Sequence, residues 1–169
     1  MHDMSNRAAA YGRTLDFGLR IHMIVRETES EARASAQNLV SKLDDADGAK
    51  IRARALNAQS FGVARQAEMR IIADNEGYAE PHVWTGVGRA RSGCGCALVG
   101  NPEQILGKLE RYKQMGFRAF IFSGYPHNAE AETFDRLVLP HLNTAKLAAL
   151  QNRIPLTPPH TPLSLGSRT

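Results

Sequence analysis

The sequence predicts an α/β fold in which parallel strands alternate with helices. Residues 15–25 and 117–122 have the composition and period of strands, and helix-starting signals follow the first strand and precede the second. Strands that alternate with helices pair in parallel through right-handed crossovers. The chain has 169 residues, of which 43% are hydrophobic and 22% charged, and this suits one globular domain.

The first strand follows a short helical segment. Residues 1–12 are typical of the end of a helix, with Gly12 just past its last turn. Apolar residues then alternate, so that one face of the strand carries Phe17, Leu19, Ile21, Met23 and Val25. Arg20 and His22 share the other face.

Helical segments follow this strand. Thr28 and Glu31 form a capping box that starts a helix running to about residue 43. Residues 44–48 end this helix, and residues 49–77 are expected to be further, arginine-rich helix. Residues 78–100 contain five glycines, and we expect a mobile insertion without regular structure there.

A second strand lies between two more helices. A capping box at Asn101 and Gln104 starts a helix that ends at Gly116. The following strand, residues 117–122, is apolar enough to be buried on both faces. A last helix is expected from about residue 129 to residue 142, bent at its proline.

These elements define one partial domain, residues 1–145, and a proline-rich flexible tail, residues 146–169. Two strands make a poor sheet, because their edges and at least one apolar face stay uncovered. We therefore expect partner chains or a preceding part of the protein to complete the core.

Composition excludes several function classes. No run approaches the ~18 to 20 apolar residues of a membrane span, and the N-terminus has no signal-peptide pattern. The net charge is +4, but the basic residues form no long run and are not interleaved with aromatic residues, so we expect no nucleic-acid partner. Cys94 and Cys96 have one residue between them, so they are poorly placed to bond to each other, and a disulfide scaffold would need more cysteines. A reducing, cytoplasmic location is therefore expected.

Arg20 and His22 are the first candidate functional pair. Two residues apart on one strand face, they point into the same space. They are either a satisfied interior pair or part of a binding site. A guanidinium on an inner face requires an anionic partner, which favours the binding site.

The glycines and arginines of residues 86–93 are typical of an anion-holding loop. Glycines allow backbone N–H groups to approach a charged oxygen, and Arg89 or Arg91 supplies the countercharge. The loop lacks both the dinucleotide fingerprint and the phosphate-loop ending, so the pattern by itself is only a weak indication of a nucleotide site. The two cysteines and His82 make a poor metal set, and we expect no metal.

Residues 123–127 follow the second strand. Tyr125 can donate a proton, and His127 can relay one near neutral pH. The same segment also suits a turn that uses its glycine and proline for geometry alone.

Four segments in register resemble the C-terminal part of the alkanesulfonate monooxygenases, within the bacterial-luciferase-like flavin monooxygenase family. They are residues 17–29, residues 84–88 with Arg91 and Gly93, residues 97–100 and residues 123–127. The likeness covers most of residues 8–145. It implies a (β/α)8 TIM barrel, of which this chain supplies the last two strands and their helices. A barrel takes ~200 to 400 residues, so the chain is expected to be a C-terminal fragment without the family's active-site cysteine.

The resemblance also implies an activity. Family members use reduced FMN, delivered by a flavin reductase, and O2 to cleave the C–S bond of an alkanesulfonate into aldehyde and sulfite. By position, Arg20, His22 and Tyr125 match catalytic residues, and Arg91 and His127 match residues that bind substrate or flavin. A homo-oligomer is expected for the full-length form.

Two alternatives stay open. In the first, the parent protein is another luciferase-like flavin monooxygenase that acts on a different sulfur compound. In the second, the chain is a non-catalytic remnant that serves in assembly. The isolated fragment is expected to be inactive alone. The role of Cys94 and Cys96 does not follow from the resemblance.

Overall fold

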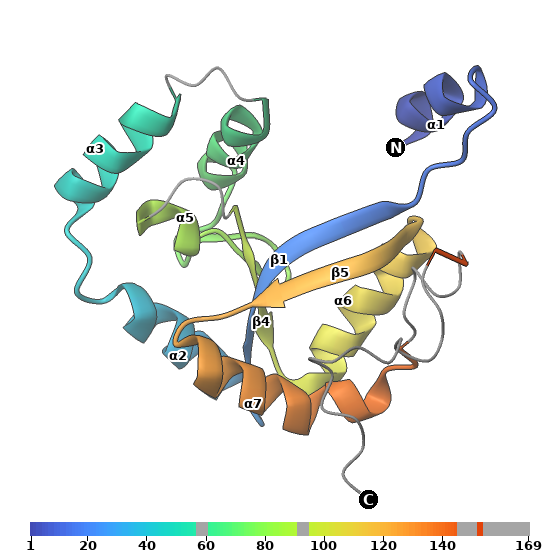
Figure 1. Cartoon of the computed structure of the whole chain (residues 1–169). Coiled ribbons are helices and arrows are strands. Elements are labelled where there is room, and N and C mark those ends of the chain that lie inside the picture. The colour runs from blue at the N-terminus through green and yellow to red at the C-terminus, as the bar shows by residue number, and fades with distance from the viewer. Residues whose placement is uncertain (57–60, 91–94, 145–151, 154–169) are drawn as a thin grey trace, which may run out of the picture.

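The structure is a computed structural model, and it describes residues 1–56, 61–90, 95–144 and 152–153. Figure 1 shows the chain with its elements labelled. In chain order they are α1 (His2–Ala9), β1 (Phe17–Val25), α2 (Glu29–Val40), α3 (Asp45–Leu56), α4 (Phe61–Ile71), β2 (Tyr78–Glu80), β3 (Val83–Trp84), α5 (Val87–Ala90), β4 (Ala97–Gly100), α6 (Pro102–Gln114), β5 (Phe117–Ser123), α7 (His127–Leu137) and the 3-10 helix η1 (Leu139–His141).

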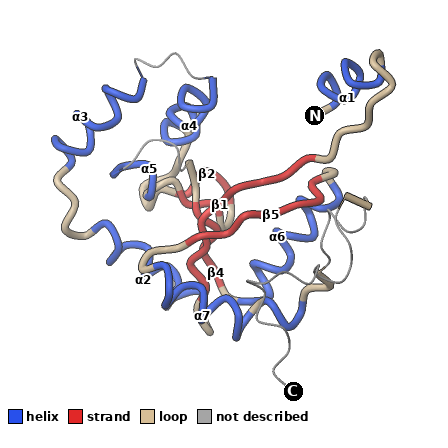
Figure 2. The backbone as a smooth tube through the Cα atoms, viewed as in Figure 1, coloured by secondary structure: helices blue, strands red, loops and turns tan. Residues whose placement is uncertain are grey.

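Five strands form one sheet in the order β2-β3-β4-β1-β5. The central strand β1 pairs in parallel with β4 on one side and with β5 on the other. The short strand β3 runs antiparallel to both β2 and β4. The predicted parallel pairing of the two long strands is confirmed, so the carboxyl ends of β1, β4 and β5 meet at one edge of the sheet (Figure 2).

Apolar clusters lie on both faces of the sheet. One joins the sheet to α6 and α7 and contains Ile21, Met23, Val25, Val83, Leu98, Ile105, Leu109, Leu137 and Val138. The other joins it to α2 and α5 and contains Ile24, Ala32, Ala36, Val40, Tyr78, Trp84, Val87, Ala97 and Val99. The predicted alternation along β1 therefore holds, because Ile21 and Ile24 fall in different clusters.

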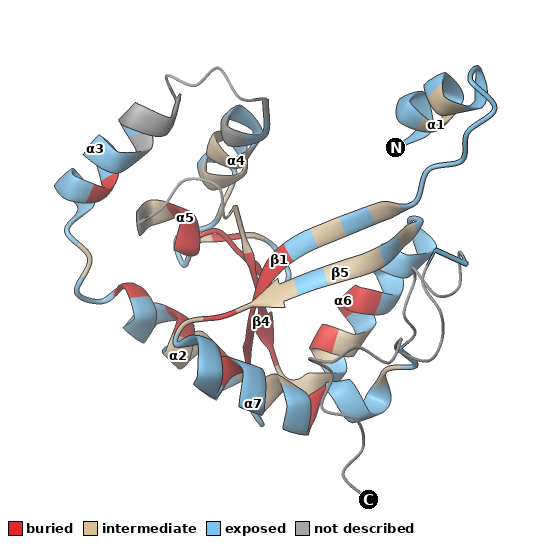
Figure 3. Ribbon diagram, viewed as in Figure 1, coloured by how far each residue is buried: buried red, intermediate tan, exposed pale blue. Residues whose placement is uncertain are grey.

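Burial is concentrated at the carboxyl end of β1 and in β4 (Figure 3). Gly18 and Arg20 at the start of β1 are exposed, and Ile121 on β5 is 64% exposed. The expectation that β5 is buried on both faces is wrong, because no described element covers its Ile121 side. Helix α1 stands apart from the sheet and has no buried residue.

Both predicted capping boxes are present. Glu31 N donates to Thr28 Oγ1 over 3.2 Å, and Thr28 N donates to Glu31 Oε2 over 3.0 Å. Gln104 N donates to Asn101 Oδ1 over 3.0 Å, and Asn101 N donates back to Gln104 Oε1 over 2.9 Å. These reciprocal bonds satisfy backbone donors that the first helical turn leaves without partners, and so fix where α2 and α6 begin.

The expected structureless insertion at 78–100 is wrong for most of its length. The segment contains β2, β3, α5 and β4, and every residue of β4 is buried between β1 and β3. Strands of two to four residues are too short to leave a periodic signal in a sequence. Residues 91–94 lie outside the described residues.

Three helix boundaries also differ from expectation. The segment 44–48 does not only end a helix, because Asp44 Oδ1 accepts from Ala46 N and Asp47 N and so starts α3. The helical segment predicted for 49–77 is divided into α3 and α4. The last helix begins earlier and ends earlier than predicted, at His127 and Leu137, and its proline lies in η1. The predicted tail lies outside the described residues except for 152–153.

No helix among the described residues is long and apolar enough to cross a membrane.

Trp84 provides a test of how tightly the β2–β4 region is packed. Its side chain is 1% exposed, and its Nε1 donates to the carbonyl of Glu76 over 3.1 Å. Gly86 lies against the indole ring, so that an added Cβ would stand 2.0 Å from Cζ2. Gly107, in α6, has open space around the same position.

We expect Gly86→Ala to lower the free energy of unfolding by about 1–3 kcal/mol, because the ring must shift out of its packed position. Gly107→Ala should raise it by about 0.5–1 kcal/mol, because alanine restricts the unfolded chain and suits a helix interior. Urea unfolding of both variants measures the difference. A Gly86→Ala variant as stable as Gly107→Ala would contradict this packing.

Candidate functional site

Three rings lie in a row at the carboxyl edge of the parallel strands. His22, on β1, is 2% exposed. The Tyr125 ring centroid lies 5.2 Å from that of His22, and the His127 centroid lies 4.8 Å from that of Tyr125. The structure thus brings together three of the five predicted site residues. We call His22, Tyr125 and His127 the ring row.

Ser123 orients the buried end of the ring row. Its Oγ lies 2.9 Å from His22 Nδ1, and the two residues are direct partners in the β1–β5 register. A hydrogen bond to one ring nitrogen fixes which way the imidazole points and favours one tautomer. The backbone adds to this, because His22 N donates to the carbonyl of Cys96 over 3.2 Å.

Tyr125 and His127 reach this position through the turn after β5. Tyr125 is half-buried and packs against the cluster that contains Ile24. The Tyr125–Pro126 peptide is cis, and α7 begins at His127, which is exposed. The row therefore runs from a buried imidazole to an exposed one, and all three side chains can donate or accept a proton.

Arg20 lies on the same face of β1 as His22, two residues earlier. Its side chain is exposed, so the expectation of a guanidinium buried on an inner face is wrong. The ion pairs found among the described residues do not include Arg20. It supplies a positive charge on the uncovered part of the sheet, beside Ile121.

Gly86 and Gly88, the two described glycines of the predicted anion-holding loop, have packing roles in this structure. Gly86 makes room for Trp84, and an added Cβ at Gly88 would stand 3.0 Å from Arg70 Nη1. The Arg89 guanidinium donates to Asp45 Oδ1 over 2.7 Å, and this ion pair ties α5 to α3. The fifth predicted site residue, Arg91, lies outside the described residues.

Cys96 is not a nucleophile in this arrangement. Burial raises the pKa of its thiol to about 11, so the thiolate is scarce at neutral pH. Cys94 lies outside the described residues. Within the ranges that the structure describes, no group of three His, Cys, Asp or Glu side chains is placed to hold a metal ion.

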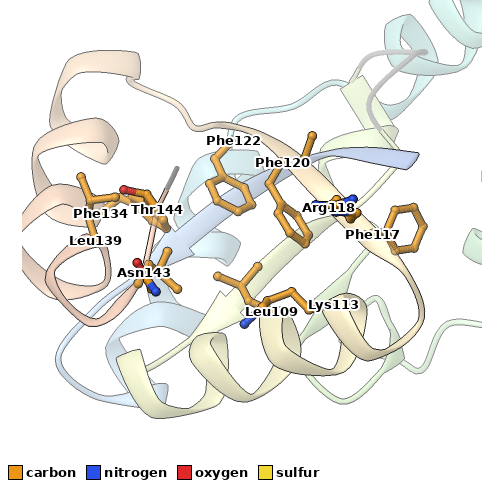
Figure 4. A pocket seen from close by; sticks show the side chains of 12 residues that line it. Leu109, Lys113, Phe117, Arg118, Phe120, Phe122, Phe134, Leu139, Asn143 and Thr144 are labelled. Atoms are coloured by element: carbon orange, nitrogen blue, oxygen red, sulfur yellow. The ribbon is translucent and has the colours of Figure 1, made fainter. Parts of the chain in front are cut away.

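A groove of about 680 Å³ lies on the other face of the sheet from the ring row (Figure 4). Phe120 and Phe122 line it from β5, and Leu109 and Lys113 line it from α6. Phe122 and Ser123 are neighbours in an extended strand and so point to opposite faces. The groove is therefore separate from the site that contains His22.

Sequence reasoning missed two contacts of the site. The bond between Ser123 and His22 depends on strand register, which no local pattern gives. An ion pair between Arg26 and Glu130 depends on how the start of α7 packs against the end of β1. The sequence offers one local signal for Glu130, because it is the acidic residue in the first turn of α7, but this signal does not identify its partner.

The luciferase-like monooxygenase family profile matches residues 1–119, and the chain belongs to this family. The resemblance seen in the sequence is therefore confirmed at the level of the family.

Two curated relatives are similar to most of this chain. The chain is 56% identical over 168 residues to the sulfoquinovose monooxygenase of Agrobacterium fabrum, covering 99% of this chain and 44% of that protein. It is 59% identical over 145 residues to the sulfoquinovose monooxygenase of Novosphingobium aromaticivorans, covering 86% of this chain and 40% of that protein. The chain thus spans less than half the length of these relatives. Both are named for sulfoquinovose, whereas the resemblance seen in the sequence implied alkanesulfonates.

The Ser123–His22 bond gives a test of the site geometry. We expect Ser123→Ala to lower the free energy of unfolding by about 1–3 kcal/mol, because it removes a hydrogen bond from a buried imidazole. Ser41→Ala is the matched control, since Ser41 Oγ donates to the carbonyl of Asn38 over 2.8 Å at an exposed position. That variant should change stability by less than about 0.5 kcal/mol. Equal losses in urea unfolding would contradict the assignment of the Ser123 hydroxyl as the partner of the buried imidazole of His22.

Proposed function

We propose that this chain carries part of the active site of a monooxygenase that uses reduced FMN and O2 to cleave the C–S bond of a sulfonate. The observation that carries the proposal is the ring row at the carboxyl edge of β1 and β5, with Arg20 on the same strand face as His22. Family membership and the names of the two relatives point to the same chemistry.

Each side chain has a role that its position suits. Arg20, exposed and positively charged, binds the sulfonate through a charge-assisted hydrogen bond. His22 and Tyr125 hold and transfer the proton, with Ser123 fixing the imidazole of His22. His127, at the exposed end of the ring row, contacts substrate or flavin. We assign Arg91 to a second cationic contact with substrate or flavin.

The described residues fit one wall of a flavin site. The sheet face around Gly18, Arg20 and Ile121 is open and largely apolar, and carries one positive charge, which suits a flat ring system with a phosphate. Bound reduced flavin supplies the activation of O2. The chain's own residues then bind the sulfonate, position it against the open face, and hold the proton at His22 and Tyr125.

The proposal extends to the full-length protein. We place residues 1–145 in a (β/α)8 barrel as its last two β/α units, with β1 and β5 as the barrel strands. The open face of β1 and β5 then faces the barrel interior. We further propose a cytoplasmic homo-oligomer that receives reduced flavin from a flavin reductase. The chain alone should release no sulfite, because it spans less than half the length of the two relatives.

Sulfoquinovose is the proposed substrate, because both relatives are named for it and are more than half identical to this chain. Simple alkanesulfonates are the second candidate, from the resemblance in residues 17–29 and 123–127. A non-catalytic role in assembly is favoured only by the uncovered face at Ile121.

A chimaera tests the proposal. This chain replaces the segment that it matches in the Agrobacterium fabrum relative, and sulfite release is assayed with a flavin reductase. We expect sulfite from sulfoquinovose, and less from linear alkanesulfonates. Arg20→Ala and Arg91→Ala should each lower kcat/KM about tenfold to a hundredfold, the value of one charge-assisted bond.

Arg111→Ala is the control, since Arg111 lies at an exposed position of α6. It should leave kcat/KM unchanged. A folded chimaera that releases no sulfite from any sulfonate would contradict the proposed function. Equal losses at Arg20 and Arg111 would contradict the assigned role of Arg20.

A further inference from the structure

Arg26 and Glu130 form an ion pair next to the ring row. Arg26 Nη2 donates to Glu130 Oε1 over 2.6 Å, and Nη1 donates to Oε2 over 3.1 Å, so the contact is bidentate. The Glu130 side chain is only 7% exposed. Arg26 Nη1 also donates to the carbonyl of Val25 over 2.6 Å, which holds the guanidinium against its own backbone. The hydrogen bonds that Arg26 donates to Glu130 raise the pKa of Arg26, so the cation persists at any physiological pH.

This pair joins the two segments that carry the ring row. Arg26 follows His22 by four residues and stands directly after the last residue of β1. Glu130 follows His127 by three residues in the first turn of α7. Arg26, Tyr125 and Glu130 line one small pocket of about 160 Å³. The distance between the two segments is therefore set at a point directly beside Tyr125.

Glu130 also constrains the turn itself. An added Cβ at Gly124 would stand 2.4 Å from Glu130 Cβ and 3.1 Å from the carbonyl oxygen of Met23. Glu130 N donates to the carbonyl of Pro126 over 3.0 Å, which closes the first turn of α7. Residues 124–130 are thus held at one end by the pairing of Ser123 with His22 and at the other by Arg26.

A buried ion pair adds little net stability, because both charges lose their hydration, but a bidentate fork fixes distance and direction. We propose that Arg26 and Glu130 are positioning residues, which hold Tyr125 against His22 and His127 against Tyr125. The consequence for catalysis rests on the proposed function, whereas the consequence for the ring row does not.

A second ion pair between the same segments provides the control. Arg136 on α7 donates to Glu27, just after β1, over 2.7 Å, and both side chains are more than half exposed. Glu27→Gln therefore removes a tie between the same two elements away from the ring row. If ion pairing between β1 and α7 matters only for stability, this variant and Glu130→Gln should behave alike.

The first measurement uses the full chain and the ¹H–¹³C NMR signals of its histidine rings. We expect Glu130→Gln and Arg26→Lys to shift the His22 and His127 signals and to weaken the Tyr125–His127 ring contacts. Glu27→Gln should leave them unchanged. Unchanged ring signals in Glu130→Gln, or equal changes in Glu27→Gln, would overturn the proposal. If Glu130→Gln does not fold, Arg26→Lys decides, because it keeps both charges and removes only the fork.

The second measurement uses the chimaera described above. Glu130→Gln should lower kcat about tenfold to a hundredfold with KM for the sulfonate unchanged, because misplaced rings slow the reaction step. A shift of the ring signals with normal kcat would overturn the positioning role in catalysis and leave the proposed function standing. If the unmodified chimaera releases no sulfite, the proposed function fails, and the ring signals still decide whether the pair positions the row.

Discussion

The parallel pairing of β1 with β5 is the constraint on which the candidate site depends. It sets His22 beside Ser123 and brings the turn after β5 to the end of β1, so that Tyr125 reaches the imidazole. A shift of register by one residue would send His22 to the opposite face, among the side chains that face α6 and α7. The apolar residues on that face, such as Met23, hold the register because they must stay buried.

The short strands beside β4 support this arrangement. Strand β4 is buried throughout and pairs with β1 along the stretch that contains His22. Trp84, whose ring lies against Gly86, belongs to the apolar cluster that contains Ala97 and Val99 of β4. This packing holds β4, and through it β1, in position. The site thus lies at the carboxyl edge of the sheet, where an aromatic turn follows β5, an arrangement typical of sites built at the carboxyl ends of parallel strands.

Much of the fold could be predicted from local patterns. Alternating apolar residues predict β1, and the capping boxes at Thr28 and Asn101 predict the starts of α2 and α6, all of which the structure contains. The two-residue strand β3 could not be predicted, because so short a segment has no period and forms only by pairing with β4. The acidic segment that begins at Asp44 indicates the end of a helix, but aspartate also caps a helix start, as Asp44 does for α3.

For the site, sequence reasoning found residues but not their contacts. His22, Tyr125 and His127 were selected from their chemistry and resemblance, and the structure brings them together. The exposure of Arg20 could not be predicted, since alternation gives the face of a strand but not what covers that face. Contacts between residues a hundred positions apart, such as Ser123 with His22, depend on register and packing.

The central claim is that His22, Tyr125 and His127 form one row of rings. Nuclear Overhauser contacts between their ring protons in the full chain test it most directly. The centroid distances of 5.2 Å and 4.8 Å predict contacts from His22 to Tyr125 and from Tyr125 to His127. Histidine signals at unfolded-peptide positions, with no contact from either ring to Tyr125, would contradict the account.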